Sequence, residues 1–232
     1  MTQQLSPSDV ARIFDADLSP TVEDPGPRYN CAPTDPLTVV LERDGGRSVE
    51  THRWGLIPAW ASSRAEGGRM INARIETAAT SPAFRVAFRR RRCIIPADGF
   101  YEWQRFERTR QPYLIRRPDG EPLPMAGLWS VWPDPATGDW VTSCAVVTTV
   151  ADQHLAPLHD RMPALLDPAD WAAWLDPGLT DPAAVRALLE RPGSGPLEVF
   201  PVSTLVNNVR NEGTALIEPV PEPPWAVRPL FG

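Results

Sequence analysis

Apolar and polar residues alternate in short runs through the middle of the chain, a pattern typical of half-buried β-strands. Two such runs, 37–42 and 49–54, flank Asp44, Gly45 and Gly46 and therefore predict a β-hairpin. Further strands are expected at 93–96, 99–104, 113–116, 125–131, 141–149 and 199–202. The longest apolar runs fall far short of a bilayer span, so a membrane protein is not expected.

Helices are predicted where Ser-Pro or Asp-Pro precedes apolar residues spaced three or four apart, because Ser and Asp cap helices and Pro suits the first position. This pattern begins at Ser6, Ser81, Asp167 and Asp181. Strands dominate the centre without regular βαβ alternation. We therefore expect an α+β fold: a single domain over 1–220 with a curled, largely antiparallel, barrel-like sheet, inserted helices and a Pro-rich tail over 221–232.

Composition narrows the class of protein. The 232 residues are 42% hydrophobic and 22% charged, as in ordinary soluble domains. The polar N-terminus has no apolar signal-peptide core, so a cytoplasmic protein is expected. Cys31, Cys93 and Cys144 are too widely spaced for a zinc ribbon or a disulfide framework. No metal and no other cofactor is expected.

All 23 basic residues are arginines. A Walker-type phosphate loop, a pyridoxal Schiff base and a lysine general base each need an ε-amine, so these classes are excluded. The N-terminal amine is the only amine that could form an imine. Residues 64–117 hold 13 arginines and five acidic residues, although the chain has a net charge of −6. This basic block is a candidate face for nucleic-acid phosphates or, alternatively, a solvated surface, especially over 89–92.

Four polar segments, 28–34, 70–77, 97–103 and 158–163, contain residues suited to acid–base work beside a phosphate-bearing substrate. Glu102 could accept or relay a proton, His159 could donate one near neutral pH, and Asn72 could orient a nucleophile. Arg74 and Arg161 could hold phosphates with paired N–H groups.

Each of these residues also has a purely structural interpretation. Asn30 and Asn72 could be turn residues, and Glu102 could point to solvent by strand alternation. An isolated histidine such as His159 is more often exposed than catalytic. Trp54, Trp60 and Trp103 offer flat surfaces for unstacked bases, but most of the nine tryptophans are expected in the core.

Six ordered motifs carry a resemblance that covers about residues 5–220: RYNCAPT, WGLIPAW, INARIETAATS, IIPADGFYEW, HDRMP and PVSTLVNNVRNEG. In this order they resemble the SRAP domain of the SOS response-associated peptidases, also described as abasic-site processing proteins. The resemblance implies binding of single-stranded DNA, or of single-strand junctions, that carry an abasic site. It also implies a role in the DNA damage response.

In that family the initiator Met is removed from a Met-Cys-Gly-Arg start. The Cys amine condenses with the sugar aldehyde, and the thiol closes a thiazolidine ring. The resulting DNA–protein crosslink shields the lesion. The resemblance implies that Asn72, Glu102 and His159 are the catalytic residues. The predicted DNA-binding residues are Asn30, Trp54, Arg74, Thr148 and Arg161.

This chain opens with MTQQLSPSDV rather than Met-Cys-Gly-Arg. Cys31 is a poor substitute, because it has no free amine for ring formation. Either the start has been assigned too far downstream, which we favour because the Asn, Glu and His set is intact, or crosslinking is lost and non-covalent DNA binding remains. A general peptidase ranks lowest, because no Ser or Cys adjoins His159. We expect a cytoplasmic monomer with autopeptidase activity, located at the nucleoid when bound to damaged DNA.

Overall fold

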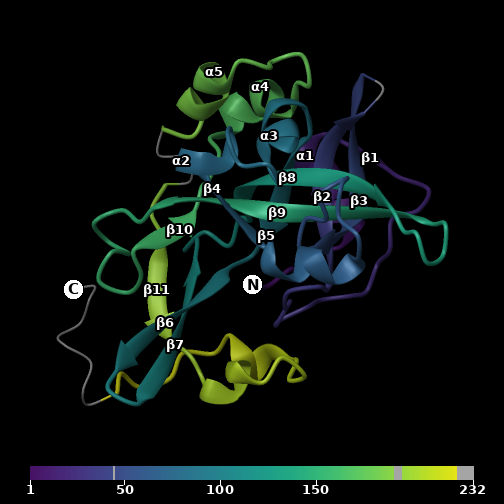
Figure 1. Cartoon of the computed structure of the whole chain (residues 1–232). Coiled ribbons are helices and arrows are strands. Elements are labelled where there is room, and N and C mark those ends of the chain that lie inside the picture. The colour runs from purple at the N-terminus through teal and green to yellow at the C-terminus, as the bar shows by residue number, and fades with distance from the viewer. Residues whose placement is uncertain (44, 191–194, 224–232) are drawn as a thin grey trace.

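The computed structural model describes residues 1–43, 45–190 and 195–223 (Figure 1). Its centre is a closed barrel of five strands: β2 (Pro36–Arg43), β3 (Gly46–Trp54), β5 (Arg92–Ala97), β8 (Leu123–Pro133) and β9 (Trp140–Val150). Neighbouring strands are antiparallel except at the closure, where β3 and β9 run parallel. The α+β prediction with a barrel-like, largely antiparallel core is confirmed. Asp44 of the predicted turn and most of the predicted tail lie outside the described residues.

Short strands extend this barrel, and a second sheet adjoins it. β1 (Asp17–Leu18) pairs in parallel with β3, β4 (Asn72–Arg74) in parallel with β9, and β10 (Arg161–Pro163) antiparallel with β9. The second, antiparallel sheet contains β6 (Phe100–Phe106), β7 (Thr109–Arg116) and β11 (Glu198–Pro201). Two edges of the long strand β9 therefore carry short strands from the polar segments.

The helices are short. They are α1 (Pro7–Phe14), α2 (Ile75–Ala78), α3 (Arg85–Arg90), α4 (Trp171–Leu175) and α5 (Pro182–Ala187), with 3₁₀ turns at Arg64–Arg69, Pro168–Asp170, Thr204–Asn207 and Thr214–Leu216. Ser6 caps α1 and Asp181 caps α5 as predicted. The helix expected from Ser81 begins only at Arg85, because a turn precedes it. In Figure 1, α3, α4 and α5 gather on one side of the barrel and β6 and β7 extend from the other.

Strand alternation divides the apolar residues into two layers. One set, including Val40, Val49 and Ile94, faces outward beneath the helices and packs with Phe88 and Trp174. The alternate set fills the barrel interior: Val39, Leu41, Cys93, Ile95, Met125, Cys144 and Val146. All three cysteines are buried free thiols. The barrel is therefore a packed core whose open end can carry a site.

Arg92 corrects the interpretation of residues 89–92 as a solvated surface. Its side chain is 2% exposed. Its Nε donates to the Trp174 carbonyl at 2.6 Å, and another nitrogen donates to the Phe88 and Arg89 carbonyls at 3.0 and 2.7 Å. The third nitrogen donates to the carbonyl of Asp176. Burial lowers the pKa of Arg92 to about 10. Arg92 thus ties α3 to α4 instead of contributing to an anion-binding face.

Replacing Arg92 by Met should lower the free energy of unfolding by about 2–4 kcal/mol, because four carbonyls lose a charged donor inside the protein. Urea unfolding measures this change. Arg89→Met is the matched control, since Arg89 is exposed on the same helix end and should change stability by no more than about 0.5 kcal/mol. Equal losses in the two variants would contradict the structural role of Arg92.

Candidate active site at the N-terminus

A cavity of about 400 Å³ opens where the barrel meets β4, β6 and β10. Apart from Asn30, every site residue predicted from the sequence lines it: Trp54, Asn72, Arg74, Glu102, Thr148, His159 and Arg161. Asn30 lines an adjoining cavity of about 620 Å³, which shares Met1 and Trp54 with the first. Polar segments that are far apart in the sequence therefore converge on one cavity.

Strand β4 presents two of these residues because side chains alternate along a strand. Asn72 and Arg74 are exposed on one face, and Ala73 between them is buried. The register places Asn72 beside Val146 and Arg74 beside Thr148 of β9. Within the described part of the chain, the Arg74 guanidinium forms no ion pair. Arg74 therefore offers the cavity a positive charge that no direct ion pair holds, although the Glu76 carboxylate acts on it from a longer distance.

Glu102 does not point to open solvent. Its side chain is 24% exposed and lines the cavity. The side chains on either side of it in β6 form hydrogen bonds of their own. The Tyr101 hydroxyl donates to the Tyr29 carbonyl at 2.7 Å, and the Trp103 indole donates to the Asn207 amide oxygen at 2.7 Å. Burial raises the pKa of Glu102 above the ordinary carboxyl value. Its carboxyl can therefore keep a proton at a pH where an exposed carboxyl has lost it.

The His159 imidazole lies beside this carboxyl. Its Nδ1 is 4.0 Å from Glu102 Oε1 and 3.0 Å from the backbone nitrogen of Arg161. The same Nδ1 is 3.0 Å from the Arg161 carbonyl oxygen and 3.4 Å from Asp160 Oδ1, so either tautomer of the ring finds a partner in the Arg161 backbone. The ring is 45% exposed, so a substrate can reach it.

The N-terminal segment is threaded into the same end of the barrel. The Thr2 N–H donates to the Gly99 carbonyl at 2.9 Å, and the Gln4 N–H donates to the Asp98 carboxylate. The Gln3 side-chain amide donates to the carbonyls of Thr38 and Pro96 at 2.9 and 2.6 Å. It bridges β2 and β5, which pair directly at only two positions, Val40–Ile94 and Leu41–Cys93. These bonds fix Met1 at the cavity wall.

The Met1 amine is therefore a candidate reacting group in the protein as given. It donates to the Cys31 carbonyl at 3.2 Å, and the Cys31 N–H donates back to the Met1 carbonyl at 2.9 Å. Burial lowers the pKa of the Met1 amine, which increases the neutral, nucleophilic fraction near pH 7. Burial raises the pKa of the Cys31 thiol, so that its reactive thiolate is suppressed.

Arg161 is already paired with a residue that the sequence reasoning missed. Two of its nitrogens bind the Glu76 carboxylate at 2.8 and 3.0 Å, and one also donates to the Thr148 carbonyl at 2.7 Å. This bidentate pair holds the pKa of Glu76 below its ordinary value. Glu76 lies in the same motif as Asn72 and Arg74, which was the available signal in the sequence.

Two other predicted DNA-binding residues make contacts within the protein. Asn30 is 6% exposed. Its side-chain amide donates to the carbonyls of Val206, Asn208 and Asn211 at 3.1, 3.1 and 3.3 Å. The Trp54 indole donates to the Ile71 carbonyl at 3.0 Å, and Trp54 is 9% exposed. Both therefore shape cavity walls, and their DNA-binding roles stay predictions.

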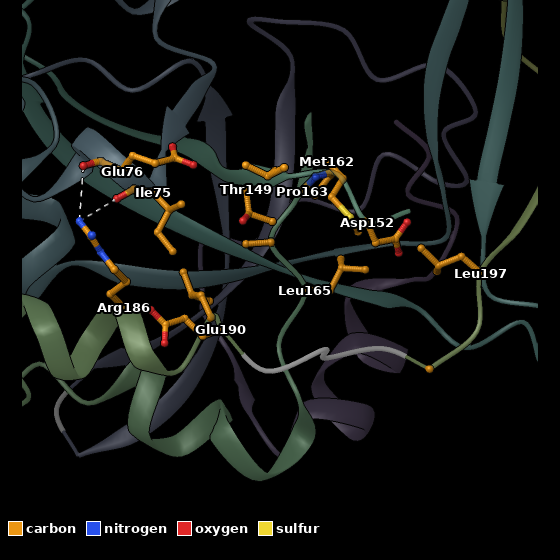
Figure 2. Close-up of a pocket in the computed structure, with 14 residues that line it drawn as sticks. Ile75, Glu76, Thr149, Asp152, Met162, Pro163, Leu165, Arg186, Glu190 and Leu197 are labelled. Carbon is orange, nitrogen blue, oxygen red and sulfur yellow. Dashed lines mark hydrogen bonds between the residues drawn. The ribbon is translucent and has the colours of Figure 1, made fainter. Parts of the chain in front are cut away.

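A further cavity of about 470 Å³ lies behind the candidate site and shares Met162 and Pro163 with it. Figure 2 shows Arg186 of α5 at its edge, donating to the backbone carbonyls of Ile75 and Glu76 at 3.5 and 3.4 Å. It contains none of the three predicted catalytic side chains. This cavity of about 470 Å³ is therefore not the candidate active site.

Among residues 1–43, 45–190 and 195–223, no three His, Cys, Asp or Glu side chains are grouped so that they could hold a metal ion. None of the helices formed by those residues has the length and apolar character needed to cross a membrane.

Comparison with known proteins gives concordant results. Residues 1–209 match the family described as SOS response associated peptidase (SRAP). The chain is 37% identical over 193 residues to Abasic site processing protein YoqW of Bacillus subtilis, covering 83% of this chain and 86% of that protein. It is 37% identical over 202 residues to Abasic site processing protein YedK of Escherichia coli, covering 85% and 87%.

More distant relatives and solved structures agree. Abasic site processing protein HMCES of Xenopus tropicalis is 33% identical over 219 residues, covering 80% of this chain and 64% of that protein. A crystal structure of a Bacteroides thetaiotaomicron protein shares the fold, with a TM-score of 0.81 at 24% identity, covering 94% and 98% of the two chains. A Bordetella bronchiseptica protein gives a TM-score of 0.72 at 28% identity, covering 87% and 98%.

Proposed function

The chain belongs to the SOS response associated peptidase (SRAP) family, and on that premise we propose that it processes abasic sites in the DNA damage response. The proposed substrate is single-stranded DNA, or a single-strand junction, with an abasic sugar in its aldehyde form. We assign this function to a domain over residues 1–220. The hydrogen bond from the Val220 N–H to the Pro201 carbonyl supports this boundary. Cytoplasmic location, monomeric state and autopeptidase activity stay predictions.

One observation carries the proposal: an N-terminal amine, a carboxyl with a raised pKa and an imidazole meet in one cavity. These are the groups that condensation of an amine with an aldehyde needs. The amine lone pair adds to the aldehyde carbon, and the nitrogen proton moves to the oxygen to give a carbinolamine. Loss of that hydroxyl as water leaves an imine. With an N-terminal Cys, the thiol then adds to the imine carbon and closes a thiazolidine ring.

The side chains divide this work. Glu102, as a protonated carboxyl, can donate the proton that lets the hydroxyl leave as water, and its carboxylate can then accept a proton from nitrogen. His159, 4.0 Å away, can supply the second proton transfer near neutral pH, including the one that reopens the ring. Asn72, which lines the same cavity, can orient the sugar oxygen or the amine.

Incubation with an oligonucleotide that carries one abasic site tests the proposal, with borohydride added to trap any imine. A DNA-bound protein band on a denaturing gel is the expected result. An oligonucleotide whose abasic aldehyde has been reduced to an alcohol beforehand is the control and should give no band. Retention on a native gel with no band after borohydride would support the non-covalent alternative instead.

Arg74→Gln should weaken binding of single-stranded DNA and flatten its salt dependence. Because Arg74 carries a charge that no direct ion pair holds, its loss should reduce the slope of log K against log salt by about 0.7, the value for one phosphate contact. Fluorescence anisotropy across a salt series measures this slope. Arg12→Gln on α1 is the control, since its guanidinium lies 3.1 Å from an Asp9 carboxylate oxygen. An unchanged slope in Arg74→Gln would remove Arg74 from the proposed DNA face.

A further inference from the structure

We propose that Glu76 is a positioning residue of this site, which both fixes Arg161 and limits the positive charge that Arg161 offers to DNA. The inference rests on the proposed function and adds a residue to it. The bidentate geometry, with distances of 2.8 and 3.0 Å, uses two of the three guanidinium nitrogens. One of these nitrogens also donates to Thr148, so the guanidinium is held from two sides.

The pair is partly shielded from water. The Arg161 side chain is 17% exposed and the Glu76 side chain is 47% exposed. Glu76 is itself held in place, because Arg186 donates to its backbone carbonyl and to that of Ile75 (Figure 2). A carboxylate fixed in this way competes with any approaching phosphate for the N–H donors of Arg161. Arg74 lines the same cavity and forms no bidentate pair among the described residues, although the charge of Glu76 also acts on it.

The pair also connects to the acid–base groups. The backbone N–H of Arg161 donates to His159 Nδ1 at 3.0 Å, and that nitrogen lies 4.0 Å from Glu102. Glu76 therefore fixes the side chain of the residue whose backbone orients the imidazole. Its loss should loosen Arg161 and free its charge at the same time. The freed charge should raise the affinity for DNA, whereas the loosened side chain should lower the crosslinking rate.

The variant Glu76→Gln allows the effect on affinity and the effect on rate to be measured separately. Affinity for undamaged single-stranded DNA should rise about two- to fivefold at low salt, the range measured for exposed charge pairs. Its salt slope should become steeper by about 0.7. The crosslinking rate at saturating abasic DNA should fall on the order of tenfold, because a displaced positioning group costs rate. A merely structural role would weaken binding or leave it unchanged, and so would not produce the gain.

Glu190→Gln is the matched control. Glu190 lines the cavity behind the site together with Glu76, and its replacement removes the same charge without touching Arg161. It should leave affinity, slope and rate unchanged. An equal gain in affinity in Glu190→Gln would reduce the effect to net charge and overturn the proposal. Weaker binding or an unchanged rate in Glu76→Gln would overturn it as well.

A measurement without DNA keeps the proposal distinct from the proposed function. Glu76→Gln and Arg161→Gln should each lower the melting temperature, and the double variant should melt no lower than the less stable single variant. Additive losses would mean that the two side chains do not act as a pair, which overturns the inference. Failure of the unaltered protein to react with abasic DNA would instead overturn the proposed function, while the melting temperatures still decide the pairing.

Discussion

Adding Met-Cys-Gly-Arg ahead of Met1 should turn a trace of borohydride-trapped imine into a crosslink that survives denaturant without reduction. The protein as given can offer the Met1 amine, but an imine on Met1 has no adjacent thiol to close a five-membered ring and should hydrolyse. If Met1 is removed, the Thr2 hydroxyl becomes the neighbouring group, and a neutral hydroxyl is a far weaker nucleophile than a thiolate. Met1 lies on the cavity wall, so residues placed directly before it begin beside Glu102.

An extension of Met-Ser-Gly-Arg is the control, because it keeps the amine and the length and replaces only the thiol. It should give an imine that borohydride traps and no stable ring. The measurement is the fraction of abasic oligonucleotide shifted on a denaturing gel with and without borohydride. A strong unreduced adduct from the protein as given would contradict this mechanism and identify a different nucleophile, for which Cys31→Ser is the first variant to examine.

Glu102→Gln should slow crosslink formation by the protein that carries the added Cys by about 10²–10⁴-fold, the usual contribution of a general acid or base. Affinity for undamaged single-stranded DNA should stay within about twofold. Burial raises the pKa of Glu102, so its acid form persists above the usual carboxyl range and is lost as pH rises through that raised pKa. The rate should therefore fall with rising pH over that range in the parent, and the Gln variant should lack this dependence. Single-turnover kinetics across pH measure both effects.

His159→Ala, measured by the same kinetics, distinguishes the role of the imidazole from that of the Glu102 carboxyl. It should slow formation or reversal of the crosslink near neutral pH while affinity for DNA is nearly unchanged. Rates equal to those of the parent in both variants would remove these residues from the mechanism. A large loss of DNA affinity in either variant would show that it acts in binding rather than in chemistry.

Much of the barrel could be predicted from the sequence, because its long strands carry their own alternating pattern. The hairpin of β2 and β3 and the long strands β8 and β9 fall within a few residues of the expected positions. The parallel closure of β3 on β9 could not be predicted, because it joins segments about 90 residues apart in a register that local pattern does not encode. β4 and β10 have three residues each and exist because β9 offers edges to pair with.

In the candidate site, too, some features could be predicted from the sequence and others could not. The ordered motifs pointed to Asn72, Glu102 and His159 as candidate catalytic residues through their resemblance to the family, and all three line one cavity. They could not show that Arg161 is paired, since its partner Glu76 lies 85 positions away in sequence. Nor could they separate Arg92 from the exposed arginines beside it, because one run of like residues contains both kinds.

The anchored N-terminus sets an order of events during synthesis. The first residues to be made have some partners at Arg28, Cys31 and Thr38, but the others lie at Pro96, Asp98 and Gly99. The full set of bonds therefore forms only after almost 100 further residues have been made. Throughout that interval the amino end is accessible to enzymes that trim nascent chains. Once the barrel closes, the same end lies in the cavity wall and its backbone bonds are occupied. Trimming by those enzymes is therefore easiest before folding, whereas the predicted autopeptidase activity would act afterwards, in the folded site where Met1 lies beside Glu102.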